Sequence, residues 1–111
     1  MQEFMNYLAG QIEACRAEIE RLEADGRKDD ANFARVRTNI YDVCRTVTNT
    51  LANRPGAGEA AVKAQFARFE TTWGAALEKA KAHGDAGAIA VEETKLAALA
   101  DVAAHFPEEQ A

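Results

Sequence analysis

Apolar residues recur at intervals of three and four through almost the whole chain, and this spacing constrains the fold more than any other feature. Residues spaced in this way lie on one face of an α-helix, so each segment predicts a helix with one buried stripe. Three stripes are complete: Phe4, Leu8, Ile12, Cys15, Ile19, Leu22; Phe33, Val36, Ile40, Val43, Val47, Leu51; and Val62, Phe66, Phe69, Trp73, Leu77, Ala80. A fourth consists of Ile89, Leu96, Leu99, Ala103 and Phe106, with Glu92 at its remaining position. The sequence therefore predicts an all-α protein.

Glycine and proline mark the places where these helices end. Gly26 and Gly84 suit the left-handed backbone conformation that closes a helix, and Pro55 cannot continue one. Pro107 ends the last helix, and we expect residues 107–111 to form a disordered acidic tail. The predicted helices occupy about 2–25, 29–53, 58–83 and 85–106.

Short connections make consecutive helices antiparallel neighbours, which predicts an up-down-up-down four-helix bundle formed by residues 1–106 as a single domain. In that arrangement Ile40 lies opposite Cys15 on one side and Trp73 on the other. The aromatic side chains of the third helix then belong to the core rather than to a ligand pocket. A square bundle also brings the first and fourth helices together, and both are acidic, so they predict an acidic face able to meet a basic partner.

Several functional classes lack support in the composition. The net charge of −5 argues against binding to a nucleic-acid backbone, and no segment has the roughly 20 apolar residues that span a membrane. With no basic leader at the N-terminus, we expect a cytoplasmic protein. Cys15 and Cys44 form no metal-binding or redox motif and are expected to be small core residues. No Glu-x-x-His motif or catalytic constellation occurs, so we expect no cofactor, no metal and no enzymatic activity.

Glu92 is the one polar residue at a predicted core position. A buried, unpaired carboxylate costs several kcal/mol, so Glu92 requires a physical explanation. Its side chain can reach water past the end of the bundle. It can instead pair with a cation such as Arg16, Arg37 or Lys81. The third possibility is a functional carboxylate, acting as a ligand or a general base.

The fourth helix carries a second stripe of small and apolar residues. This stripe consists of Ala88, Val91, Ala98 and Val102, and Lys95 interrupts it. A helix that is apolar on two faces is usually covered on both, so the stripe predicts a close contact with another helix, most simply in a homodimer. The sequence thus favours a non-enzymatic interaction or structural module that binds itself or another protein. The alternative is a small-molecule or metal-binding bundle that uses Glu92.

Overall fold

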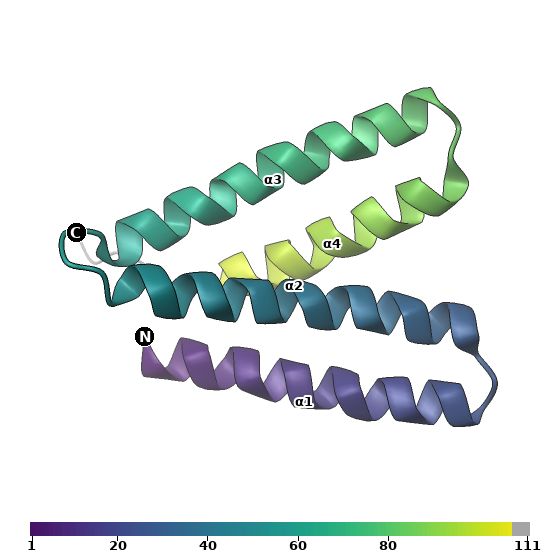
Figure 1. Ribbon diagram of the computed structural model, residues 1–111, viewed down its shortest axis with the longest axis horizontal. Coiled ribbons are helices and arrows are strands. Elements are labelled where there is room, and N and C mark those ends of the chain that lie inside the picture. Colours follow the sequence, from purple (N-terminus) through teal and green to yellow (C-terminus); the bar gives the residue numbers. More distant parts are fainter. Residues whose placement is uncertain (108–111) are drawn as a thin grey trace.

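The computed structural model describes residues 1–107 and places four helices in them: α1 (Gln2–Ala24), α2 (Lys28–Ala52), α3 (Gly58–Ala82) and α4 (Ala86–His105). Figure 1 shows that each helix reverses the direction of the one before it. The predicted all-α, four-helix fold is confirmed, and each helix bound lies within one residue of its predicted position. Of the predicted tail, residues 108–111 lie outside the described part of the chain. No helix in residues 1–107 is long and apolar enough to cross a membrane.

Two of the turns close in the way that their glycines predict. Gly26 has a φ of 74° and Gly84 a φ of 63°, a left-handed conformation that other residues rarely adopt. Each turn is closed by backbone hydrogen bonds to the preceding helix, such as the 3.0 Å bond that the Asp85 N–H donates to the Ala80 carbonyl. The side chain of Asp85 then accepts a 3.1 Å hydrogen bond from the Ala88 N–H and caps the start of α4.

All four helices contribute to one large core at the end of the molecule that contains the α2–α3 loop. Aromatic rings bridge the helices there, with Phe106, directly after α4, edge-on to Phe4 of α1 at 5.1 Å and to Phe66 of α3 at 5.6 Å between ring centroids. The core also includes Leu8, Ile12, Cys15, Ile40, Tyr41, Cys44, Val62, Ala98, Leu99 and Val102. These contacts hold the two helical hairpins together.

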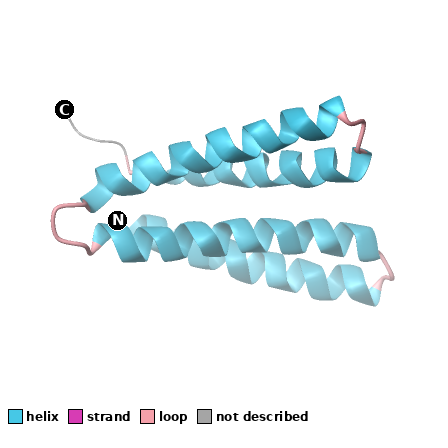
Figure 2. Cartoon of the chain, turned by 45° about the horizontal axis from the view of Figure 1, so that its top comes forward, coloured by secondary structure: helices cyan, strands magenta, loops and turns pink. Residues whose placement is uncertain are grey.

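Away from this core the hairpins diverge. Figures 1 and 2 show the α1–α2 hairpin and the α3–α4 hairpin joined by a single loop and separating toward their other ends. α2 packs against all three other helices, whereas α1 meets α4 only over a short stretch and meets α3 only through side chains such as Phe4 and Phe66, whose ring centroids are 6.5 Å apart. The radius of gyration is 15.3 Å, against about 13 Å for a compact domain of this length. The predicted square bundle, with α1 and α4 side by side along an acidic face, is therefore wrong.

The predicted stripe of α2 is rotated from the buried face that the structure shows. Val43 is 40% exposed, whereas Tyr41, Cys44 and Thr48 are buried. Tyr41, Cys44 and Thr48 each lie one position after a residue of the predicted stripe, and one position along a helix corresponds to a rotation of about 100°. The apolar pattern missed this face because two of its residues carry hydroxyl groups. Thr48 satisfies its hydroxyl by donating a 2.7 Å hydrogen bond to the Cys44 carbonyl.

The core predicted from the four stripes is also incomplete at the diverging end. There a second, small core forms within the first hairpin alone, from Leu22, Ala31 and Ala34. Ala80 is also buried there, whereas the other predicted core residues of that end are only half-buried: Ile19, Phe33, Val36, Trp73, Leu77, Ile89 and Leu96. Each hairpin therefore packs its own helices, and the apolar surface between the hairpins stays partly open.

Candidate functional site

A groove of about 760 Å³ lies between α3 and α4. Large apolar side chains form its floor, which consists mainly of Phe66, Leu96, Leu99 and Phe106. Phe66, Leu99 and Phe106 belong to the core and are at most 8% exposed, so the groove is a concavity over side chains that their own chain already covers. Its shape suits a partner helix.

Small residues on both walls keep this groove open. Ala67 and Gly74 of α3 face Ala100 and Ala103 of α4, and none of them has a side chain long enough to cover the floor. The charged residues that line the groove, Lys63 and Glu70, both belong to α3.

The predicted interface stripe of α4 does not form a continuous exposed surface. Ala98 and Val102 are buried in the large core of their own chain, and Val102 is fully covered. Ala88 and Val91 are half-buried. The stripe faces inward because α4 lies against α2 as well as α3, and this second contact occupies the face that the sequence left without a partner.

Glu92 is neither solvated nor paired with any of the three cations that the sequence suggested. Its side chain is 14% exposed, and its Oε1 lies 3.0 Å from the Nζ of Lys95, one turn farther along the same helix. Its Oε2 is the one buried side-chain oxygen or nitrogen among the described residues that has no hydrogen-bond partner. The position is thus a partly satisfied ion pair at the edge of the interior.

Lys95 connects this ion pair to the aromatic side chains of α3. Its Nζ lies 5.5 Å from the ring centroid of Trp73, a distance at which a cation is attracted to the face of the ring. The Trp73 ring is stacked on Phe69 with 4.9 Å between centroids and an interplanar angle of 4°. Glu92 therefore belongs to a local network between α3 and α4.

A second polar cluster, which the sequence did not predict, joins three helices. The hydroxyls of Tyr7 on α1 and Tyr41 on α2 both donate to the same carboxylate oxygen of Asp101 on α4, over 2.5 and 2.6 Å. His105 lies against the Tyr7 ring, and its Nδ1 lies 3.5 Å from the other Asp101 oxygen. These contacts lie beside the large core and fix α4 against the first hairpin.

The cluster shifts the acidity of its members in opposite directions. Burial and the contacts with Asp101 raise the pKa of Tyr7 to about 12 and also raise the pKa of Tyr41. Burial opposes ionisation of Asp101, but the hydrogen bonds from Tyr41 and Tyr7 and the charge of His105 outweigh it and lower the pKa of that carboxyl. The cluster is therefore stable with an ionised aspartate and two neutral phenols.

These shifts predict a loss of stability at high pH. Tyrosines of an unfolded chain ionise near pH 10, so the folded state retains the Tyr7 proton over a range in which the unfolded state has lost it. Stability should be complete below about pH 10 and should fall as the pH rises toward 12. Because Tyr7 and Tyr41 are the only tyrosines in the chain, the ultraviolet absorbance of tyrosinate measures this cluster directly. A folded protein whose tyrosines titrate near pH 10 would contradict the assignment.

Both cysteines are buried and free, as components of the large core. Burial raises the pKa of the Cys44 thiol to about 12, so this thiol stays protonated and unreactive at neutral pH.

Comparison of the chain with protein-family models, with curated proteins and with solved structures finds no match.

Proposed function

We propose that this protein is a non-enzymatic interaction module that associates with a second copy of itself through the groove between α3 and α4. The observation that carries the proposal is the groove itself, a concavity of about 760 Å³ that small residues on both walls leave unfilled above a mostly buried apolar floor.

The test is the mass of the protein in solution. Sedimentation equilibrium or native mass spectrometry should give twice the chain mass of 12.0 kDa at micromolar concentration. Replacing Ala100 by glutamate places a charge in the groove and should weaken the dimer at least about tenfold. Ala97→Glu makes the same change at an exposed position of α4 outside the groove and should leave the dimer intact. A wild-type monomer at all concentrations would overturn the proposal.

A second candidate function, small-molecule binding at Glu92, is favoured by the Oε2 atom that has no partner. A ligand would have to displace the side chains that cover this oxygen before its N–H or O–H group donated a hydrogen bond to it. Native mass spectrometry should then detect an added mass on the wild-type chain that is absent from Glu92→Leu. The same spectra therefore compare both candidate functions.

Stability measurements on that variant provide an independent prediction. Glu92→Leu should raise the free energy of unfolding by about 1 kcal/mol, because it removes a buried oxygen without a hydrogen bond and leaves Lys95 over the Trp73 ring. Glu93 is exposed and next in sequence, so Glu93→Leu should change stability by less than about 0.5 kcal/mol. Urea unfolding of both variants makes the comparison. A clear loss of stability in Glu92→Leu would mean that its ion pair with Lys95 is a net stabilising contact.

A further inference from the structure

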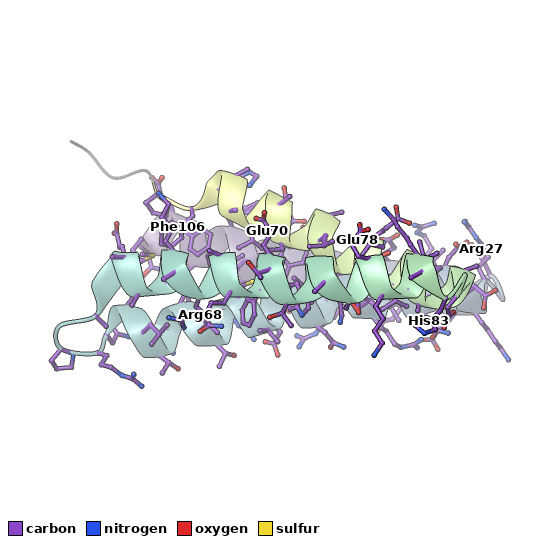
Figure 3. All side chains as sticks on the ribbon, turned by 90° about the horizontal axis from the view of Figure 1, so that it is seen from above. Arg27, Arg68, Glu70, Glu78, His83 and Phe106 are labelled. Carbon is purple, nitrogen blue, oxygen red and sulfur yellow. The ribbon has the colours of Figure 1, made fainter. Side chains whose placement is uncertain are left out.

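Charges of opposite sign occupy the two ends of one exposed face of α3. Lys63, Ala67, Glu70 and Gly74 line the groove at helical spacing, and Glu78 continues the same face one turn later. Figure 3 shows Glu70 and Glu78 along one edge of α3, with Arg68 on the opposite edge. Lys63 and Glu78 are separated by about 22 Å along the helix, at a rise of about 1.5 Å per residue.

The charges at the two ends of this face are complementary when a second α3 is laid against it in the opposite direction, although the Glu70 carboxylates of the two copies then lie next to each other at the two-fold axis and repel. An antiparallel pair with its two-fold axis between Glu70 and Thr71 places Lys63 opposite Glu78 of the second copy, and Glu78 opposite Lys63 of the second copy. Lys63 makes no ion pair within the described chain, and Glu78 has only an exposed contact of 3.6 Å with Lys81. Both charges are therefore free to pair across the interface.

The same register brings small residues together between the charged pairs. Ala67 lies opposite Gly74 of the second copy, and Gly74 opposite its Ala67, which allows the two backbones to approach closely. A glycine inside a helix is less stable than alanine by about 1 kcal/mol, and a Cβ at Gly74 would meet no atom of its own chain within 4 Å. Packing within the single chain thus gives no reason for glycine at this position.

We infer that two copies of the chain pair through antiparallel α3 helices, with reciprocal ion pairs between Lys63 and Glu78 and with Gly74 at the close approach. This inference rests on the proposed self-association and assigns its register. The two charge pairs select the antiparallel orientation, because a parallel pair in register would set like charges opposite each other.

Exchanging the charges of Lys63 and Glu78 tests the register of the proposed helix pair. Lys63→Glu and Glu78→Lys should each weaken the dimer about tenfold, because by symmetry each replaces two attractive pairs by two repulsive ones. The double variant Lys63→Glu/Glu78→Lys should restore the wild-type dissociation constant to within about threefold. Arg68→Glu makes the same charge change as Lys63→Glu on the opposite edge of α3 and serves as the control. Sedimentation velocity at low salt measures all four variants, with circular dichroism as the check of folding.

A second pair of variants tests the close approach. Gly74→Leu should dissociate the dimer without unfolding the chain, whereas Gly10→Leu, at a mid-helix glycine of α1 that is equally open, should leave the dimer intact. If the wild type is dimeric but the single charge variants match it, the register is overturned while self-association stands. Failure of the double variant to restore the dimer overturns the register as well. A monomeric wild type overturns both proposals.

Discussion

Replacing Val102 by glutamate should unfold the protein. Val102 is completely buried in the large core, and an unpaired carboxylate there costs several kcal/mol, comparable with the total stability of a small domain, about 5–15 kcal/mol. Circular dichroism should show a large loss of helix, or a urea midpoint far below that of the wild type.

Val91→Glu is the matched control, since it makes the same substitution on the same helix at a half-buried position. We expect it to fold with a much smaller loss of stability. The sequence alone treats the two valines as members of one stripe and predicts that both substitutions dissociate an oligomer without unfolding it. A folded Val102→Glu chain with wild-type stability would support that earlier interpretation and contradict the buried position of Val102.

Asp101→Ala should have the next largest effect, with a loss of about 3 kcal/mol in the free energy of unfolding. The carboxylate accepts hydrogen bonds from two tyrosines, and hydrogen bonds to a charged group contribute about 1.5–3 kcal/mol each. Its removal leaves the Tyr41 hydroxyl buried without an acceptor. Urea unfolding gives the measurement. Asp42→Ala removes an exposed carboxylate that pairs with Arg45 and should cost less than about 0.5 kcal/mol.

A double-mutant cycle separates the hydrogen bonds of Asp101 from its other contacts. Combining Tyr41→Phe with Asp101→Ala should lose less stability than the sum of the two single variants, by about 1–2 kcal/mol. Equal losses in Asp101→Ala and Asp42→Ala would show that the cluster contributes nothing to holding the helices together.

The helices could be predicted from the sequence because their signals are local. The α1 stripe from Phe4 to Leu22 is largely buried as predicted, and the glycine turns form where Gly26 and Gly84 indicated them. The angle between the hairpins could not be predicted in this way. Apolar spacing identifies a face on each helix, but it contains no information on how far two hairpins diverge. The stripes therefore predict Val36 and Trp73 as core residues, although both are only half-buried.

The polar contacts show the same difference between local signals, which the sequence contains, and long-range contacts, which only the fold creates. Glu92 was identified correctly as an unusual position, and its partner Lys95 was available from the sequence as the cation three residues later on the same helix. The Asp101 cluster was not, because its members come from three helices and only the fold brings them together. One signal was present, namely an isolated aspartate between Ala98 and Val102 in an apolar stretch of the last helix.

The divergence of the hairpins has a consequence for how the chain acquires its structure. Each hairpin joins helices that are neighbours in sequence, and contacts between near neighbours form fastest. During synthesis the α1–α2 hairpin is complete before α4 exists, so the acceptor for the Tyr41 hydroxyl is made last. We therefore expect the two hairpins to form quickly and to dock in a slower step. In that step the Asp101 carboxylate of α4 accepts its hydrogen bonds from the first hairpin and fixes the two hairpins against each other.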